Sequence, residues 1–284
     1  MPWRRWLFLE SIKGRKDLDP FYGLESPRGL NFQIIEIFNH QPVRIIMYID
    51  NELCQKCLDC LPVCPVAAIK ARNHRIEIDY DECVECGVCR RLRICKEKAI
   101  MQVKEIPYPR LLRQVFSDPT KNHPTTGVLG RGTEEMKTND ITNIFTKGYI
   151  GFSVELGRPG LGARLSELDK VTRKVTEMGV VFAKDNPVIP LIQDMKTGAL
   201  LPEILGEKVL SAIAEFLVEE PRALNLIREL TAFLDSELDT VATLSVIERA
   251  DENGRSVFYE KLKDQGFHPY PNGKVNIGLA KGAS

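Results

Sequence analysis

Cysteine placement is the feature that most limits what this 284-residue chain can fold into. All eight cysteines lie between residues 54 and 95, and none occurs elsewhere. They form two runs, C-x2-C-x2-C-x3-C and C-x2-C-x2-C-x5-C, whose members are Cys54, Cys57, Cys60 and Cys64, followed by Cys83, Cys86, Cys89 and Cys95. Thiols this dense are either cross-linked to one another or bound to metal.

Three kinds of site can use such runs. Disulfide frameworks belong to small secreted domains, whereas this chain is about two average domains long. Structural zinc sites use two cysteine pairs separated by a long spacer. Three thiolates at i, i+3 and i+6 can instead surround three corners of an iron–sulfur cube, with a remote cysteine as the fourth ligand. The spacing therefore favours iron–sulfur binding, with zinc and disulfides as the alternatives.

The two runs belong to an internal repeat. Ile49-Asp50 precedes the first run and Ile78-Asp79 the second, while Ala68-Ile69 and Ala99-Ile100 follow them. The first three cysteines of the runs are offset by 29 residues and the last by 31. With these motifs, residues 43–105 resemble the bacterial-type two-[4Fe–4S] ferredoxins.

The resemblance implies two [4Fe–4S] clusters and a ligand set for each. In that family the last cysteine of each run crosses to the other cluster. One cluster would then take Cys54, Cys57, Cys60 and Cys95, and the other Cys83, Cys86, Cys89 and Cys64. The metal ligands expected on this basis are Cys54, Cys57, Cys60, Cys64, Cys83, Cys86, Cys89 and Cys95.

The loop before Cys95 departs from the family pattern. It is two residues longer, Lys96 replaces the usual proline, and it is basic through Arg90, Arg91, Arg93, Lys96 and Lys98. These cations would favour the more reduced form of a nearby cluster or form a docking patch. A solvated turn with no effect on a cluster is the alternative.

Patterning predicts the elements around the cysteines. We expect strands at 43–50, 75–79 and 99–103 and a short helix starting at Pro65. Residues 1–42 are predicted to be an N-terminal arm, with Trp3, Trp6 and Phe8 buried and an extra strand at 32–38. Residues 106–148 are rich in proline and glycine and are predicted to be a linker, either flexible or strapped across a cluster or a subunit.

A second domain is predicted over residues 149–284. The pattern indicates strands at 149–155, 179–183, 240–248 and 275–279, and helices starting near Ser166, where Asp169 would complete a capping box, and at 256–265. Helical patterns at 202–218 and 222–234 are predicted to form an insertion. The fold class is therefore α+β: a two-cluster module followed by a ferredoxin-like βαββαβ sandwich with a helical insertion, similar in outline to ACT-type small-molecule-sensing domains.

One loop of this domain has a second interpretation. Gly157-Arg158-Pro159-Gly160-Leu161-Gly162 lies between a predicted strand and a helix, where backbone N–H groups can hold an anion with Arg158 and Arg164. Pro159 removes one donor, and the pattern is not the dinucleotide fingerprint. A plain strand-to-helix turn is the favoured prediction.

Composition excludes several function classes. Lys plus Arg and Asp plus Glu both number 39, so no global charge attracts nucleic acid. No run approaches the roughly 18 apolar residues of a membrane helix. Arg4-Arg5 begins like a twin-arginine export signal, but residues 13–17 are charged where an apolar core would follow, so a cytoplasmic protein is expected.

The four histidines do not have the spacing of metal ligands and are expected at the surface or in the core. They are His40, His74, His123 and His268.

The prediction is low-potential, single-electron transfer by an oxidoreductase subunit that has no catalytic residues of its own and works with a protein redox partner or catalytic subunit. One alternative is a redox-linked sensor whose C-terminal domain binds a small-molecule effector. Another is a reductase that holds a flavin or nucleotide at residues 157–162.

Overall fold

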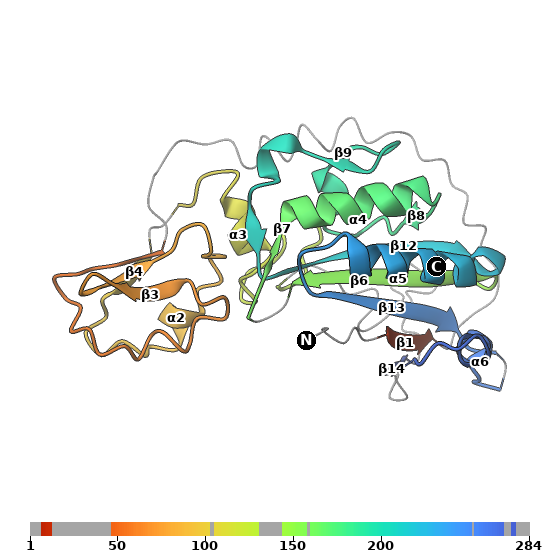
Figure 1. Cartoon of the computed structure of the whole chain (residues 1–284), viewed down its shortest axis with the longest axis horizontal. Helices are drawn as coiled ribbons and strands as arrows, with labels where there is room; N and C mark the ends of the chain where they lie inside the picture. Colours follow the sequence, from red (N-terminus) through yellow and green to blue (C-terminus); the bar gives the residue numbers. More distant parts are fainter. Residues whose placement is uncertain are drawn as a thin grey trace.

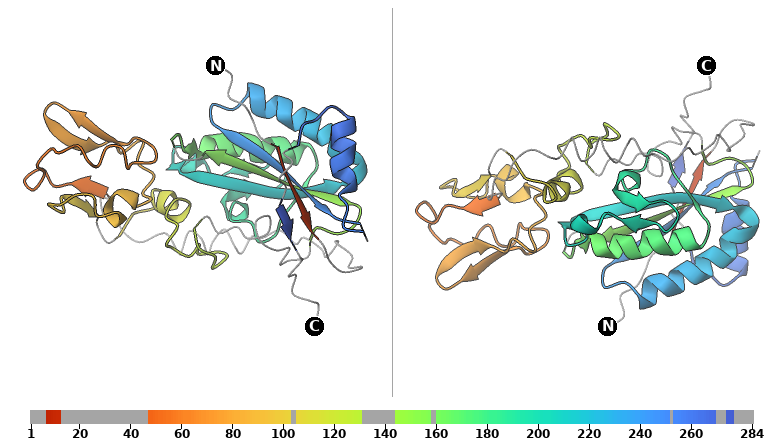
Figure 2. Two further views of the ribbon diagram at one scale, coloured as in Figure 1. Left: turned by 90° about the horizontal axis from the view of Figure 1, so that it is seen from below. Right: turned by 90° about the horizontal axis from the view of Figure 1, so that it is seen from above.

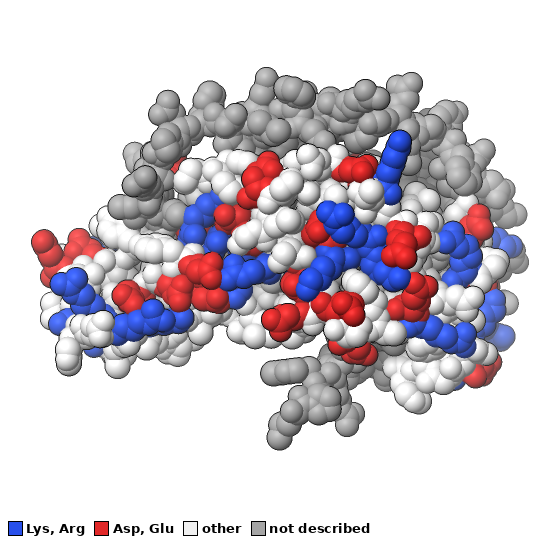
Figure 3. Space-filling model, turned by 45° about the horizontal axis from the view of Figure 1, so that its top comes forward, with Lys and Arg blue, Asp and Glu red and all other residues white. Residues whose placement is uncertain are grey.

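The computed structural model describes residues 7–12, 47–102, 105–130, 144–157, 160–251, 253–269 and 274–276. The cysteine-bearing module forms one lobe, and a sheet covered by helices forms the other (Figure 1). Acidic and basic side chains are interspersed over the face drawn in Figure 3. In the part of the chain described here, no helix combines the length and apolarity needed to cross a bilayer.

The module contains two short antiparallel ladders that exchange strands between the halves of the repeat. Strand β2 (Met47–Ile49) pairs with β5 (Ile100–Gln102), and β3 (Ile69–Arg72) pairs with β4 (Arg75–Ile78). Alternating side chains of these strands point inward and form a small apolar core of Met47, Ile49, Ile69, Ile76, Ile78, Ala99 and Ile100.

The helix predicted to start at Pro65 is wrong. Residues 65–66 form a turn rather than the first turn of a helix, because Ala67 has a left-handed φ of 51° and cannot continue one. The short helix α2 lies instead at Val88–Arg91, within the second cysteine run. Residues 43–46, the first half of the first predicted strand, lie outside the described residues.

The second lobe is built on a six-stranded sheet in the order β14-β1-β13-β6-β12-β8. The neighbouring strands β13, β6, β12 and β8 pair antiparallel to one another, whereas β1 runs parallel to β13, and β14 parallel to β1. The strands are β6 (Tyr149–Gly157), β8 (Val181–Phe182), β12 (Ser211–Glu219), β13 (Ala242–Arg249), β1 (Leu7–Ile12) and β14 (Lys274–Asn276).

Two long helices pack on one face of this sheet (Figure 2): α4 (Leu165–Glu177) and α5 (Glu220–Ser236). The α4 stripe Leu168, Val171 and Val175 is fully buried against the sheet. Each such side chain contributes about 1.5–3 kcal/mol through removal of apolar surface from water. The shorter helix α6 (Val257–Asp264) adds Phe258 and Leu262 to the same core.

The capping box predicted at the start of α4 is wrong. The helix begins at Leu165, and its first N–H groups donate to backbone carbonyls of Glu207 and Leu205 rather than to a Ser166 box. Asp169 instead accepts from the backbone N–H of Leu200 at 2.7 Å.

The helix predicted at 202–218 is also wrong, whereas the one at 222–234 lies within α5. Residues 202–218 contain the 3-10 turn η2 (Pro202–Ile204), the short strand β11 (Lys208–Val209) paired with β7 (Ala163–Arg164), and most of β12. Eight of the nine β12 residues are buried, so the strand is covered on both faces. A strand of this kind lacks the alternation that would distinguish it from a buried helix.

The final strand and the N-terminal arm extend the sheet. Strand β1 places residues 7–12 beside β13, so this part of the arm joins the second lobe. The side chain of Phe8, together with Trp3, Trp6 and the strand predicted at 32–38, lies outside the described residues.

Residues 105–130 are packed rather than a free connector. Helix α3 (Leu111–Val115) contributes Leu112 to the core of the second lobe, and Phe116 follows it there. A bridge pairs Asn122 with Leu129. The predicted linker therefore holds an element that the proline and glycine content concealed. The remaining small elements are the 3-10 turn η1 (Ile189–Leu191) and the hairpin of β9 (Ile192–Asp194) with β10 (Ala199–Leu200).

Candidate iron–sulfur site

The two cysteine runs start from the same backbone arrangement. The N–H of Cys54 donates to the carbonyl of Asp50 at 3.0 Å, and the N–H of Cys83 to that of Asp79 at 2.9 Å. These aspartates are held in turn by the opposite half, since the N–H of Asp50 donates to Ala99 and that of Asp79 to Ala68, both at 2.8 Å. Each run therefore begins on a strand end that is fixed by the other half of the repeat.

Left-handed residues recur at equivalent positions of the two runs. Lys56 and Leu58 have φ of 58° and 70°, and their counterparts Glu85 and Gly87 have φ of 56° and 69°. Backbone conformations of this kind are costly for residues other than glycine and are kept where a function requires them. Successive N–H groups around such residues form concavities that bind anions and iron–sulfur centres.

The cysteines of the two runs line two separate cavities. A cavity of about 230 Å³ is bounded by Cys54, Cys57, Cys60 and Cys95, and a second, smaller one by Cys64, Cys83, Cys86 and Cys89. Each cavity therefore combines three cysteines of one run with the last cysteine of the other. Among the residues that the structure describes, no three His, Cys, Asp or Glu side chains converge as ligands of a single metal ion would.

Both cavities offer the chemistry that a sulfur-bound iron centre needs. The backbone N–H of Ala68 donates to Cys64 Sγ at 3.1 Å, and that of Ala99 donates to Cys95 Sγ at 3.3 Å, as N–H groups do around cluster thiolates. Burial raises the pKa of Cys83, and it raises the pKa of Cys89 to about 12. Bound iron would supply the positive charge that favours a buried thiolate. The residues present thus fit an iron–sulfur group.

Comparison with known proteins agrees with this geometry. Residues 46–95 match the family model of the 4Fe-4S dicluster domain. A ferredoxin-like protein in the vnf region of Azotobacter vinelandii is 42% identical over 52 residues, which cover 17% of this chain and 80% of that protein. The chain belongs to the 4Fe-4S ferredoxins. Residues 46–95 are its bacterial-type 4Fe-4S ferredoxin domain.

Two further relatives differ in how much they share. The Methanocaldococcus jannaschii protein "Pyruvate synthase subunit PorD" is 41% identical over 58 residues, 20% of this chain and 65% of that protein, so just under two thirds of its length is matched. A Saccharopolyspora erythraea ferredoxin is 26% identical over 133 residues, 46% of this chain and 93% of that protein. No solved structure matches the chain.

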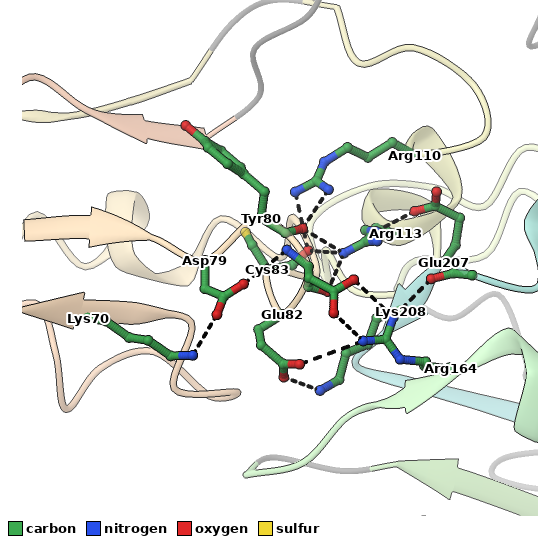
Figure 4. Close-up of polar contacts among 12 residues, drawn as sticks. Lys70, Asp79, Tyr80, Glu82, Cys83, Arg110, Arg113, Arg164, Glu207 and Lys208 are labelled. Carbon is green, nitrogen blue, oxygen red and sulfur yellow. Dashed lines mark hydrogen bonds and ion pairs between the residues drawn. The ribbon is translucent and has the colours of Figure 1, made fainter. Parts of the chain in front are cut away.

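The ferredoxin domain is fastened to the second lobe at the loop that leads into Cys83 (Figure 4). The buried guanidinium of Arg113 donates through Nη1 to the carbonyls of Tyr80, Asp81 and Cys83 at 3.0, 2.9 and 2.9 Å. Its Nε donates to Glu207 of the second lobe. One side chain of α3 therefore binds both lobes and the backbone of a candidate cluster ligand.

Arg110, which precedes α3, makes a second contact with the same loop. It donates to the carbonyl of Tyr80 at 2.7 Å and, through Nη2, to Glu85 Oε1 at 2.7 Å. Glu85 lies between Cys83 and Cys86, is completely buried, and leaves its Oε2 without a hydrogen-bond partner. Burial raises the pKa of this carboxyl, while the charge of Arg110 opposes the rise.

The glycine-rich loop 157–162 lies at this joint. The N–H of Gly160 donates to the carbonyl of Pro65, next to Cys64. Arg164, predicted to assist an anion, binds Asp81 at 2.5 Å and the Gly206 carbonyl at 3.1 Å. That ion pair lowers the pKa of Asp81. These contacts make the described part of the loop a packing turn between the lobes; Arg158 and Pro159 lie outside the described residues.

The basic loop before Cys95 is partly engaged. Arg91 pairs with Asp118 at 2.8 Å, and Arg90 donates to Gln102 at 3.3 Å. Arg93, Lys96 and Lys98 are exposed. Sequence reasoning identified this loop and all eight cysteines, but it missed Arg110, Arg113, Glu85 and Glu207. The only feature of the sequence that could have drawn attention to Glu85 was its position between two cysteines of the second run. Nothing in the sequence around Arg110 and Arg113 indicates their contacts.

Proposed function

We propose that the chain holds two [4Fe–4S] clusters and carries single electrons as a subunit of a larger oxidoreductase complex. The observation that supports this most directly is the division of the eight cysteines between two cavities. One cluster is assigned to Cys54, Cys57, Cys60 and Cys95, and the other to Cys64, Cys83, Cys86 and Cys89. A cluster supplies reversible one-electron chemistry when bound.

The residues around the cysteines position and tune the site. Ala68 and Ala99 direct N–H groups at Cys64 and Cys95, which stabilises added negative charge on the sulfurs. Arg113 holds the backbone of the Cys83 loop through three carbonyls. Because the second lobe supplies Glu207 to Arg113, the geometry at one cluster depends on how the lobes pack.

A protein partner is part of the proposal. The printed name of the Methanocaldococcus jannaschii relative makes it a subunit of pyruvate synthase, and a comparable role as the electron-carrying subunit is proposed for this chain. Catalysis would then belong to another subunit. A cytoplasmic location is included, because free thiolates persist in a reducing compartment.

For the second lobe the proposal includes a ferredoxin-like sandwich. Its support is the chain order β6, α4, β8, β12, α5, β13 together with the sheet order β13-β6-β12-β8 and antiparallel neighbours throughout. The flavin- or nucleotide-binding alternative at residues 157–162 gains no support, because the described part of that loop and Arg164 are engaged at the joint.

The test is metal analysis of protein purified without oxygen. Wild-type protein should contain about eight iron and eight sulfide per chain, the content of two cubes. Cys95→Ser and Cys64→Ser should each perturb one paramagnetic centre, and not the same one. Leu92→Ser, an exposed position in the same loop as Cys95, is the control and should keep both centres.

Two results would contradict the proposal. Stoichiometric zinc without iron would refute cluster binding altogether. Unchanged paramagnetic centres in Cys95→Ser would refute the crossed assignment while leaving cluster binding intact.

A further inference from the structure

The two cysteine loops share a backbone conformation but differ in exposure. Cys57 is exposed, whereas its counterpart Cys86 is 7% exposed. Leu58 is 48% exposed, whereas the equivalent Gly87 is buried. Residues 55–59 are all exposed and residues 84–87 are all buried. The first loop is therefore open to solvent, while the second is covered.

The cover over the second loop comes from the rest of the same chain. Arg110 binds Glu85, and Leu210 packs against the cluster of buried residues that contains Val84 and Cys86. Among the described hydrogen bonds and ion pairs, none joins residues 51–60 or 93–98 to residues beyond 102. An outside protein can therefore reach a cysteine loop directly at Cys57.

The surface around Cys57 has an apolar centre and a basic side. Leu53 and Leu58, at 43% and 48% exposure, flank Cys57. Lys96 and Glu97 line the same cavity as Cys57, which places this end of the basic loop at the edge of the surface. Residues 90–98 contain five basic side chains and one acidic side chain, Glu97. Residues 51–59 contain one basic side chain, Lys56, and two acidic ones, Glu52 and Asp59.

We propose that this surface, with Leu53 and Leu58 at its centre and Arg93, Lys96 and Lys98 on one side, docks the acidic face of a redox protein. The inference rests on the proposed function, since it assumes a cluster at Cys54, Cys57, Cys60 and Cys95. One electron passes per encounter: the carrier loses the electron that the chain gains, with no bond or proton transferred.

Physical reasons favour an acidic partner. Uncompensated cations beside the docking point raise the association rate of an oppositely charged protein, most strongly at low salt. Two exposed leucines supply the apolar centre that a docking patch needs, with charges at its rim. The small apolar area suits a transient complex, which an electron carrier needs in order to dissociate after each transfer.

The experiment measures electron-transfer rates by stopped flow with two carriers of opposite charge: reduced flavodoxin, which is acidic, and oxidised cytochrome c, which is basic. The test variant is Arg93→Glu with Lys98→Glu, which leaves all cysteines and Lys96 intact. The matched control is Lys184→Glu with Lys196→Glu, the same charge change at exposed positions of the second lobe. Leu58→Asn probes the apolar centre while keeping a residue that tolerates a left-handed φ.

We expect the test variant to lower the flavodoxin rate about tenfold at low salt and to flatten its salt dependence. The cytochrome c rate should not fall, and the control variant should match wild type. Leu58→Asn should lower the flavodoxin rate and leave its salt dependence unchanged. Equal effects of the test and control variants, a salt-independent rate, or equal loss with both carriers would overturn the docking surface.

Iron and sulfide are measured in every variant before the kinetics. A wild-type chain without clusters would defeat the proposed function itself. Intact clusters with no effect of the Arg93 and Lys98 charges would defeat only the docking inference.

Discussion

At the scale of single residues, His123 shows how burial alone can make stability depend on pH. Its side chain is 3% exposed, its Nδ1 lies 2.9 Å from the Thr125 hydroxyl, and its Nε2 is buried without a hydrogen-bond partner. Phe116 contacts the ring edge-on, with centroids 5.1 Å apart. Burial lowers the pKa of His123 to about 4, so the folded chain holds this ring neutral.

The linkage has a definite sign. The unfolded histidine has a pKa near 6.5, so between about pH 6.5 and 4 the unfolded chain binds the extra proton and the folded chain does not. We therefore predict that the free energy of unfolding is highest above about pH 6.5 and falls by up to about 3 kcal/mol as the pH drops toward 4. Denaturant titrations at several pH values measure this.

His123→Asn is the comparison for that series. Asn can keep an acceptor near Nδ1 for the Thr125 backbone but has no titrating ring. The difference in unfolding free energy between wild type and variant should narrow as the pH falls. A constant difference from pH 7 to pH 5 would contradict the titration of His123.

At the residue scale, sequence could indicate candidate ligands only where their spacing carries the chemistry. The eight cysteines lie within two short runs, so the spacing that indicates their common role can be read directly from the chain. Arg110 and Arg113 could not be found in this way. Their partners are mainly backbone carbonyls about 30 residues away, and a carbonyl carries no residue identity that a sequence could reveal.

At the scale of elements, the turn before β7 is fixed by a close approach of backbones. Gly162 has φ +69°, and a Cβ there would lie 2.8 Å from the Val209 carbonyl and 3.4 Å from a methyl carbon of Val66. Gly127 has nearly the same φ, +71°, but a Cβ there would meet nothing within 4 Å. The two glycines therefore share their backbone strain and differ in the space around them.

We predict that Gly162→Ala destabilises the chain more than Gly127→Ala, by about 1–3 kcal/mol. The left-handed φ costs both variants about 1 kcal/mol, and only the first also forces apart the paired strands β7 and β11 and the Val66 contact. Chemical denaturation of both variants measures the difference. Equal destabilisation of the two variants would contradict the prediction, because it would mean that the neighbours of Gly162 move to make room for the methyl group without a cost in stability.

Elements were predictable from sequence where one face meets water. The helix α4 keeps a clear apolar stripe because its other face is solvated, so its position was predicted to within one residue of its start. Strand β12 is buried on both faces, and α3 is five residues long within a proline-rich segment. Neither gives a periodic signal, because periodicity requires a contrast between two faces and enough residues to repeat it.

At the scale of the whole molecule, the polar contacts that couple the two lobes differ in strength. Arg164 with Asp81 and Lys208 with Glu82 are ion pairs at a partly exposed joint. Pairs of this kind contribute about 1 kcal/mol or less each, because water screens them. Arg113 is buried, and its removal would leave Glu207 and the Asp81 carbonyl without this donor, while the Tyr80 carbonyl would keep its hydrogen bond from Arg110. Breaking a buried pair costs about 3–5 kcal/mol.

Coupling between the lobes should therefore depend more on the buried Arg113 than on the exposed pairs of Arg164 and Lys208, with the buried Arg110–Glu85 pair retained as a second link. We predict that Arg113→Ala separates thermal loss of visible cluster absorbance from loss of far-ultraviolet circular dichroism, so that the ferredoxin domain melts first. The double variant Arg164→Ala with Lys208→Ala should keep the two transitions together. Arg173→Ala, which breaks an exposed pair with Asp169 within α4, controls for loss of an arginine and should shift neither. Separation in the double variant but not in Arg113→Ala would show that exposed charge, and not the buried guanidinium, joins the lobes.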